Sequence, residues 1–388
     1  MTEHQNTLDI ILKNNASMSP TEVRNILVLY MARGNHIGDM STKADKLRYL
    51  RSYFVNAALD ANFLVRGGNE HYKDLLLHNP HLDSVTSVEL KDIDFNKYDV
   101  VFCASQDETE LLKHLQDTYN GSDNHDHFRL AVFSISALLL ERMAISQFVF
   151  PVCEDLYRRI DFKPGELYVT EEERLWADQW LEQNGMQKHE SLYILLDSTS
   201  NPIKLIRTRV YFEYLKFLLK REGVKVLIFD EQLLGKEAQY SEWLTEEEMS
   251  KMIFCKAQGL RAAMCILASH YTSFLFGPCT GLVHCISSIN NRFISVGMPH
   301  EEAPIIITYT GVYQQGDSAQ NWWGSAPLVN CLLVKERDHG PQVYWLKELP
   351  EEERAVEDPL PCSVYTAEML ISRTAALLQA REARRVEA

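Results

Sequence analysis

The chain has 388 residues, of which 46% are hydrophobic and 24% charged, a composition typical of a soluble globular protein with room for two domains. Its formal net charge of -15 argues against nucleic acid as a principal partner, because phosphate contacts need clustered Lys and Arg. The same charge argues against docking on an anionic membrane surface.

The cysteine pattern and the N-terminal segment indicate a cytoplasmic protein. The 8 cysteines are scattered and form neither a CxxC pair nor a zinc-ligand spacing, which favours free thiols in a reducing compartment. Residues 1–19 are polar and lack an apolar signal core. No apolar run is long enough to span a bilayer, so we expect no transmembrane segment.

The first half of the chain opens with a strand, a loop and a helix. Asn25–Met31 is a continuous apolar run, as in a strand buried on both faces of a parallel sheet. A turn over residues 32–39 follows, and Met40–Leu59 has helical periodicity. The turn contains only Gly34 and Gly38, so it is not a GxGxxG dinucleotide fingerprint. It still lies at the carboxyl end of a strand, where open α/β sheets bind ligands.

Strands and helices continue to alternate, which predicts a doubly wound parallel sheet. The expected strands and helices are Ala61–Val65, Asn69–His78, Ser84–Val88, Tyr98–Ala104, Glu108–Tyr119 and Arg129–Ile135. The polar loop before the last strand contains His125, Asp126 and His127, which could ligate a metal. Alternate side chains on a polar loop are more often simply solvated, and we expect no metal site.

A helix after Thr170, ending at Gly185, separates this array from a second one. The second array is expected as Ser191–Leu196, Thr208–Arg221, Val224–Phe229, Met252–Cys255, Gly259–Ser269, Thr272–Phe276, Leu282–Ile289 and Arg292–Val296. A further strand-end loop is expected at Met298–Glu302, and a helix at Thr366–Ala380. Trp322 and Trp323 could stack on a ligand or fill a core.

The stretch Phe276–His284 is expected to form a strand end, a Gly-Pro turn and a helix start. A helix N-terminus binds anions readily, because its first N–H groups are unpaired and the macrodipole is positive there. Thr280 could cap this helix, and Gly281 would let a ligand approach the backbone. His284 lies one turn further on. Alternatively, Thr280 is only a cap and His284 only a polar residue on a half-buried helix.

Polar residues follow three other strands. Asp39 is a candidate general base, or merely a cap of the next helix. Lys204 shares a strand-end loop with Ser198 and Thr199 and could bind an anion, although a solvent-exposed lysine is the plain alternative. Glu231 could bind ribose hydroxyls, as acids do in other nucleotide folds, or be an ordinary loop residue.

These motifs together resemble the heptosyltransferase-type glycosyltransferases of the GT-B architecture. The matching segments, in chain order, are Gly38-Asp39, Leu75–Val85, Tyr98–Val101, Leu167–Gly185, the loop with Lys204, Glu231, and Thr280–His284. Two positions depart from the family pattern: Cys279 stands where the family has an aspartate, and Leu205 follows the lysine where the family's lysine motif contains a tryptophan.

The resemblance implies an α/β GT-B fold with two Rossmann-like, doubly wound parallel-sheet domains and a cleft between them. Residues 1–165 would form the acceptor-binding domain, 166–190 a linker helix and 191–350 the nucleotide-sugar-binding domain. Residues 351–388 would form a C-terminal helix that packs back on the first domain.

The resemblance also implies metal-independent, inverting transfer of a heptose-like sugar from a nucleotide-diphosphate-sugar, with ADP as one candidate nucleotide. The acceptor would be a saccharide or small molecule, and no cofactor is expected. The implied residues are Asp39 and Lys204 in catalysis, Ser198, Thr199, Glu231, Thr280, Gly281 and His284 at the donor, and Asn35, His36 and Gly38 on the acceptor side. A sugar-nucleotide epimerase and a non-catalytic binding scaffold remain as alternatives, and the oligomeric state stays open.

Overall fold

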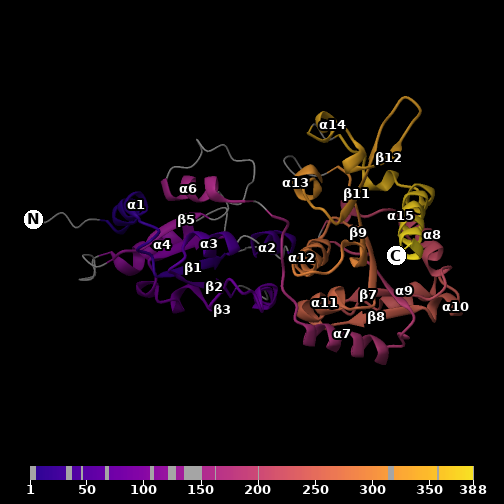
Figure 1. Cartoon of the computed structure of the whole chain (residues 1–388), viewed down its shortest axis with the longest axis horizontal. Coiled ribbons are helices and arrows are strands. Elements are labelled where there is room, and N and C mark those ends of the chain that lie inside the picture. Colours follow the sequence, from indigo (N-terminus) through magenta and orange to yellow (C-terminus); the bar gives the residue numbers. More distant parts are fainter. Residues whose placement is uncertain are drawn as a thin grey trace, which may run out of the picture. The chain divides into compact units, whose positions relative to one another are not determined.

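The computed structural model describes residues 6–31, 37–44, 47–65, 70–104, 109–120, 128–134, 151–161, 163–199, 201–312, 319–355 and 358–387. The chain divides into two compact units, Met1–Lys163 and Pro164–Ala388, each built on its own sheet (Figure 1). Within the described ranges, no helix is both long and apolar enough to cross a membrane.

The first unit contains a five-stranded sheet with the order β3-β2-β1-β4-β5, and every pairing in it is parallel. Its elements are α1 (Thr7–Ser17), β1 (Asn25–Tyr30), α2 (Ile37–Ala44), α3 (Leu47–Tyr53), β2 (Ala58–Phe63), the 3₁₀ helix η1 (Glu70–Leu76), β3 (Ser84–Thr86), η2 (Leu90–Asp92), η3 (Phe95–Lys97), β4 (Val100–Cys103), α4 (Thr109–Tyr119), β5 (Ala131–Ser134) and α6 (Pro151–Arg159).

Both faces of this sheet are covered, because side chains alternate along each strand. Leu27 and Leu29 of β1 belong to the apolar cluster that also contains residues of α1 and α4. On the opposite face, Phe54, directly after α3, contacts Phe102 of β4 with a ring-centroid distance of 5.8 Å. Helix α1 was not predicted; its Ile10 is buried in the first cluster.

The second unit contains a seven-stranded sheet with the order β12-β11-β10-β9-β6-β7-β8. Its elements are α7 (Glu171–Gln183), β6 (Ser191–Leu195), η6 (Pro202–Lys204), α8 (Thr208–Leu219), β7 (Val224–Asp230), α9 (Lys236–Ser241), α10 (Glu246–Met249), β8 (Met252–Lys256), α11 (Gly259–Ala268), β9 (Thr272–Pro278), α12 (Gly281–Ser295), η7 (His300–Glu302), β10 (Ile305–Tyr309), α13 (Ala319–Trp323), β11 (Val329–Lys335), β12 (Gln342–Trp345), η8 (Leu346–Glu348), α14 (Glu351–Ala355), η9 (Cys362–Val364) and α15 (Ala367–Glu387).

Strand order locates the switch point of this sheet. All its pairings are parallel except that of β12 with β11. From β6 the chain moves outward through β7 and β8, then returns to place β9 on the other side of β6, followed by β10 and β11. The direction therefore reverses between β6 and β9. Ligands of open α/β sheets bind outside the carboxyl ends of the strands at such a point.

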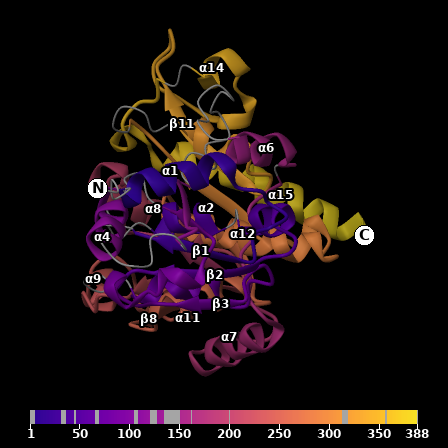
Figure 2. The same ribbon diagram turned by 90° about the vertical axis from the view of Figure 1, so that its left-hand side faces the viewer.

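Helices cover both faces of the second sheet as well. Helices α8 and α15 contribute to the buried cluster on one face, and α11 and α12 contact β9 and β10. Helix α7 begins with the predicted cap: the Thr170 hydroxyl accepts the Glu173 N–H, and the Glu173 carboxylate accepts the Thr170 N–H. It lies on the outer side of α11 (Figures 1 and 2).

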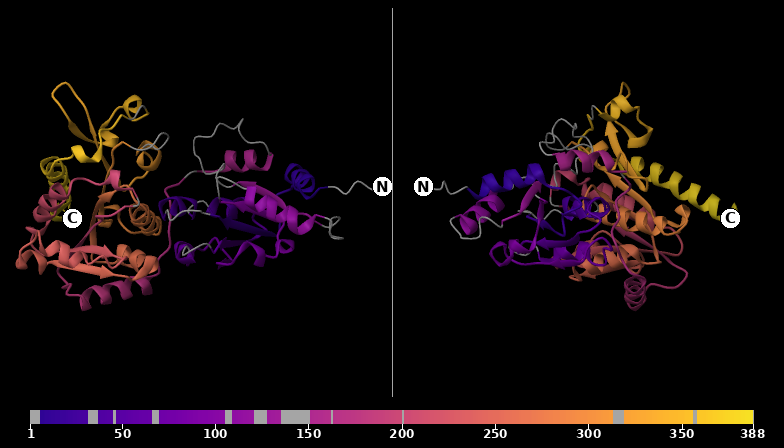
Figure 3. Two further views of the ribbon diagram at one scale, coloured as in Figure 1. Left: turned by 180° about the vertical axis from the view of Figure 1, so that it is seen from behind. Right: turned by 60° about the vertical axis from the view of Figure 1, so that its left-hand side comes forward.

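The C-terminal helix packs within the second unit. Helix α15 lies alongside α8, as Figures 1 and 3 show, with Leu370 and Leu378 buried in the same cluster as Tyr214. The hydroxyls of Tyr214 and Thr374 are 2.8 Å apart, and both side chains are fully buried. The packing of residues 351–388 on the first unit stays a prediction, and the neighbour that the structure shows lies within the second unit. The physical reason is that α8 presents an apolar face that α15 covers.

Four predicted segments differ in the structure. Arg292–Val296 is not a strand, because α12 continues to Ser295; the next strand is β10, so Met298–Glu302 precedes a strand instead of following one. Where one helix was expected over Met40–Leu59, the structure has two, α2 and α3; the second ends at Tyr53, and β2 begins at Ala58. Within the segment expected as the helix Asn69–His78, Glu70–Leu76 forms a 3₁₀ helix.

The packing of α15 on α8 can be tested with the buried hydroxyl pair. Tyr214→Phe and Thr374→Val should each lower the free energy of unfolding by about 1–3 kcal/mol, because each leaves one buried hydroxyl unpaired. The double variant should lose less unfolding free energy than the sum of the two single losses, since no unpaired hydroxyl remains. Denaturant unfolding measures all three, with the exposed Ser372→Ala on the same helix as control. Strict additivity would contradict the contact.

Candidate functional site

The carboxyl ends of β6 and β9 meet at the switch point of the second sheet. The Leu196 N–H donates to the Phe276 carbonyl at 2.8 Å. A Cβ atom on Gly277 would lie only 2.5 Å from Leu196 Cβ, so only glycine permits this approach. The loops that follow β6 and β9 therefore leave the sheet next to each other, and they carry most of the predicted donor residues.

Thr280 occupies the N-cap position of α12 without acting as a cap. Its backbone is extended (φ -147°, ψ 167°), and its hydroxyl accepts no N–H from the described first turn of the helix. The first N–H groups of an α-helix lack intrahelical acceptors. Gly281, the first helical residue, and the half-buried Thr280 thus present N–H groups and a hydroxyl that the helix itself does not use.

His284 is held against two tryptophans of α13. Its ring stacks on Trp323, with a centroid distance of 4.2 Å and an interplanar angle of 21°, and meets Trp322 edge-on at 5.5 Å. Burial, with a smaller contribution from the charge of Lys204, lowers the pKa of His284 from 6.5 to about 3. His284 is therefore a neutral imidazole near pH 7, which donates a hydrogen bond from one ring nitrogen and accepts one at the other. Trp323 is core, and Trp322 is half-buried.

Lys204 lies in the same region as His284. It ends η6 and is half-buried. Its positive charge lowers the pKa of His284 and opposes the burial that raises the pKa of Cys362 to about 12. The ammonium is thus within electrostatic range of both residues. Lys204 therefore lies near His284, which is one turn into α12, and the donor-binding role of these residues stays a prediction.

The other predicted donor residues lie on the same edge of the sheet. Ser198 is exposed and Thr199 half-buried, both in the loop directly after β6. Glu231 follows β7 and is exposed. One of its carboxylate oxygens accepts the Gly259 N–H at 3.0 Å, at the start of α11. A carboxylate is favourable at a helix N-terminus, so Glu231 has a structural contact that leaves its other oxygen for a ligand.

The acceptor-side residues belong to the first unit. Helix α2 begins at Ile37, earlier than predicted, so Gly38 and Asp39 lie in its first turn and Asp39 is not the residue before the helix. The side chain of Asp39, all of Asn35 and His36, and His125–His127 lie outside the described residues. Across the described ranges, no group of three or more His, Cys, Asp or Glu could hold a metal ion.

A buried polar network beside the site was not predicted. Asp197, at the end of β6, accepts hydrogen bonds from Lys236 and Tyr240 of α9, and the Tyr240 hydroxyl also contacts that of Tyr211 in α8. Lys236 is only 6% exposed. No local pattern marks a lysine for burial when its partner is 39 residues away in the chain. The stacking of Trp323 on His284 was missed for the same reason.

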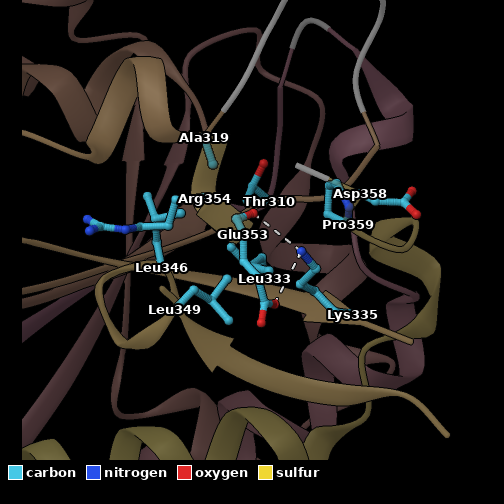
Figure 4. A pocket seen from close by; sticks show the side chains of 10 residues that line it. All are labelled: Thr310, Ala319, Leu333, Lys335, Leu346, Leu349, Glu353, Arg354, Asp358 and Pro359. Atoms are coloured by element: carbon cyan, nitrogen blue, oxygen red, sulfur yellow. Dashed lines mark hydrogen bonds and ion pairs between the residues drawn. The ribbon is translucent and has the colours of Figure 1, made fainter. Parts of the chain in front are cut away.

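A small pocket lies at the carboxyl ends of the neighbouring strands β10 and β11 (Figure 4). Thr310 and Lys335 line it, and the Lys335 ammonium is 3.6 Å from the Glu353 carboxylate. The Thr310 hydroxyl is buried and has no hydrogen-bond partner among the described residues. The cavity volume is about 10 Å³, which is room for one water molecule and not for a sugar.

The fold is similar to solved glycosyltransferase structures. A glycosyl transferase of family 9 from Veillonella parvula matches with a TM-score of 0.60 and 15% identity, over 94% of this chain and 99% of that chain. The ADP-heptose LPS heptosyltransferase II of E. coli matches with a TM-score of 0.60 and 14% identity, over 92% and 99%. No family model and no curated protein matches the sequence. The similarity confirms the predicted α/β fold with two Rossmann-like sheets; identity this low supports the fold alone.

The neutral state of His284 can be tested by NMR. Its ring C–H resonance, identified by its loss in His284→Gln, should not titrate between pH 8 and 5, because the pKa is about 3. Lys204→Ala should leave the pKa of His284 well below its usual value, since burial is the larger cause, whereas Trp323→Ala should raise it toward 6.5 by exposing the ring.

The lowered pKa of His284 makes the stability of the folded protein depend on pH. A folded-state pKa below the unfolded value means that only the unfolded state takes up a proton between about pH 6.5 and 3. The contribution of His284 to stability is therefore complete above pH 6.5 and is lost as the pH falls. A ring that titrates near pH 6.5 in the folded protein would contradict this description of the site.

Proposed function

We propose that this chain is a glycosyltransferase that binds a nucleotide-diphosphate-sugar at the switch point of its second sheet and transfers the sugar to an acceptor hydroxyl. The observation that carries the proposal is the convergence of Lys204, His284 and the N-terminus of α12 at one place. The fold similarity to a family 9 glycosyl transferase and to a heptosyltransferase supports sugar transfer as the reaction class.

The donor diphosphate fits the polar groups of this region. Lys204 supplies a positive charge, and the first N–H groups of α12 supply donors at the positive end of the helix dipole. Neutral His284 adds one hydrogen bond without a further charge. The hydroxyls of Ser198, Thr199 and Thr280 can bind phosphate oxygens, and the free oxygen of Glu231 can accept from ribose hydroxyls.

The proposed reaction is a single displacement. The acceptor oxygen attacks the anomeric carbon from the side opposite the diphosphate, the bond from that carbon to the phosphate oxygen breaks, and the configuration inverts. Asp39 takes the proton from the acceptor hydroxyl. Lys204 and the α12 N-terminus stabilise the charge that develops on the leaving nucleoside diphosphate, which would make a metal ion unnecessary.

ADP-heptose is the first donor to test, because the similar E. coli protein is named for ADP-heptose and lipopolysaccharide. The presence of Cys279 where the resembling family has an aspartate leaves the sugar itself open. A saccharide or a small molecule would serve as the acceptor.

Donor binding is tested by a thermal-shift and calorimetry panel of ADP-, GDP-, UDP-, CMP- and dTDP-linked sugars and their free nucleotides. One nucleoside diphosphate should raise the melting temperature by mass action. Lys204→Ala should weaken its binding by about tenfold to a hundredfold, the worth of a hydrogen bond to a charged group. Thr280→Val should also weaken it, and this loss cannot reflect a broken cap, because Thr280 makes none with α12.

The matched control is Lys188→Ala, an exposed lysine in the turn before β6, at the opposite edge of the sheet. It should leave binding unchanged. If no nucleotide or nucleotide-sugar shifts the melting temperature of the wild-type protein, the donor-site assignment is wrong.

Catalysis is tested with Asp39→Ala. Loss of a general base should reduce turnover by about a hundredfold to ten-thousandfold, while the donor dissociation constant stays unchanged. The products are measured by release of the nucleoside diphosphate with a panel of saccharide acceptors. Unchanged turnover would exclude Asp39 as the base. If the donor binds but no acceptor in the panel leads to its consumption, the result would favour a non-catalytic scaffold.

A further inference from the structure

The loop between β6 and α8, residues 198–207, carries three of the residues assigned to the donor, and its described part, residues 198–199 and 201–207, has little structure of its own. Its one regular element is the short η6, in which the Lys204 N–H donates to the Asn201 carbonyl at 3.0 Å. Ile203, next to Lys204, is 54% exposed. A loop of this kind needs contacts from outside to hold a lysine in one place.

Both ends of this loop are held by one helix, α9. Asp197 precedes the loop, and its two carboxylate oxygens accept from Lys236 Nζ at 2.5 Å and from the Tyr240 hydroxyl at 2.9 Å. Tyr211, in the first turn of α8 beyond the loop, is 2.8 Å from the same Tyr240 hydroxyl. Because that hydroxyl gives its proton to Asp197, the Tyr211 hydroxyl must donate to it.

The same helix also fixes the next loop of the site. Lys236 Nζ donates to the Phe229 carbonyl at 2.7 Å, at the end of β7. The Asp230 carboxylate accepts the N–H groups of Leu234 and Lys236 at 2.8 and 3.2 Å. This closes the turn that begins with Glu231. Helix α9 is therefore bonded, through Lys236, to the strand that precedes Glu231 and, through Lys236 and Tyr240, to both ends of the loop that carries Lys204.

Burial makes this network more than a surface contact. Lys236, Tyr240 and Tyr211 are 6%, 3% and 7% exposed. A buried ion pair brings little net stability, because desolvation of the two charges offsets much of their attraction. Its geometry is directional, however, so it can select one loop arrangement over others. In the arrangement that the structure shows, Lys204 lies within electrostatic range of His284.

We propose that Lys236, Asp197, Tyr240 and Tyr211 form a clamp that positions Lys204 for the donor diphosphate. The inference rests on the proposed function. These four are positioning residues: they act through the loop and are not assigned a contact with the donor. Fixing the loop before binding removes part of the ordering cost of binding, which is how preorganisation raises affinity.

Tyr240→Phe is the decisive variant, because it removes one hydroxyl from the clamp and leaves the Lys236–Asp197 pair and the ring in place. Hydrogen exchange of the amides of Lys204 and Leu205 should accelerate in it, while the amides of β6 and β9 keep their rates. The dissociation constant for the nucleoside diphosphate should rise by about threefold to tenfold. Both are measured well below the melting temperature, where each protein is folded.

A double-mutant cycle separates positioning from general stability. In the Lys204→Ala background, Tyr240→Phe should have a much smaller effect on nucleotide binding, because the charged residue that the clamp positions is gone. A merely structural role would weaken binding equally in both backgrounds. The matched control is Tyr271→Phe, which also removes a hydroxyl bonded to a carboxylate, that of Glu182 at 2.6 Å, but before the amino end of β9. It should change neither exchange nor binding.

The outcomes distinguish the two proposals. If the wild-type protein binds no nucleotide, the proposed function is wrong and the positioning role falls with it. If the wild type binds but Tyr240→Phe changes neither loop exchange nor affinity, the clamp is overturned and the donor site stands. Faster loop exchange with unchanged affinity would also overturn the positioning role.

Discussion

The close contact between Gly277 and Leu196 is the constraint on which the candidate site depends. It allows β6 and β9 to pair up to their carboxyl ends. These two strands are neighbours in the sheet, although β7 and β8 lie between them in the chain. Two loops then leave the sheet side by side, one with Lys204 and one with the N-terminus of α12. A side chain at position 277 would push the two strand ends apart, and the positive groups of the site would separate.

The site concentrates positive potential on a chain whose formal net charge is -15. Few positive groups take part: Lys204 and the partial charge at the start of α12. Lys236, also close, is neutralised by Asp197 at 2.5 Å. His284 is kept neutral by burial against Trp323. An anionic ligand bound there, as proposed, would meet Lys204 and a set of N–H groups, which would favour a diphosphate bound at defined points over loose attraction to a basic surface.

Sequence reasoning succeeded where the signal is local. The apolar runs of β1, β6 and β9 and the cap of α7 at Thr170 were predicted because each depends on neighbouring residues. The prediction of a strand at Arg292–Val296 was wrong, because a short apolar run does not distinguish the end of a helix from a strand. The partners of Lys236 and His284 could not be predicted, since they come from segments joined only by the fold. The gathering of Lys204 and His284 was expected from the rule that ligands meet the carboxyl ends of strands.

The cysteines have a consequence for how this protein can be studied. All eight belong to the described ranges, where each is buried and none forms a disulfide. A buried thiol reacts with an alkylating reagent only when the surrounding structure opens, so the labelling rate reports local or global unfolding. Cys103 and Cys153 lie in the first unit and the other six in the second. Mass spectrometry of the labelled peptides would therefore give a separate opening free energy for each unit of the unmodified natural chain.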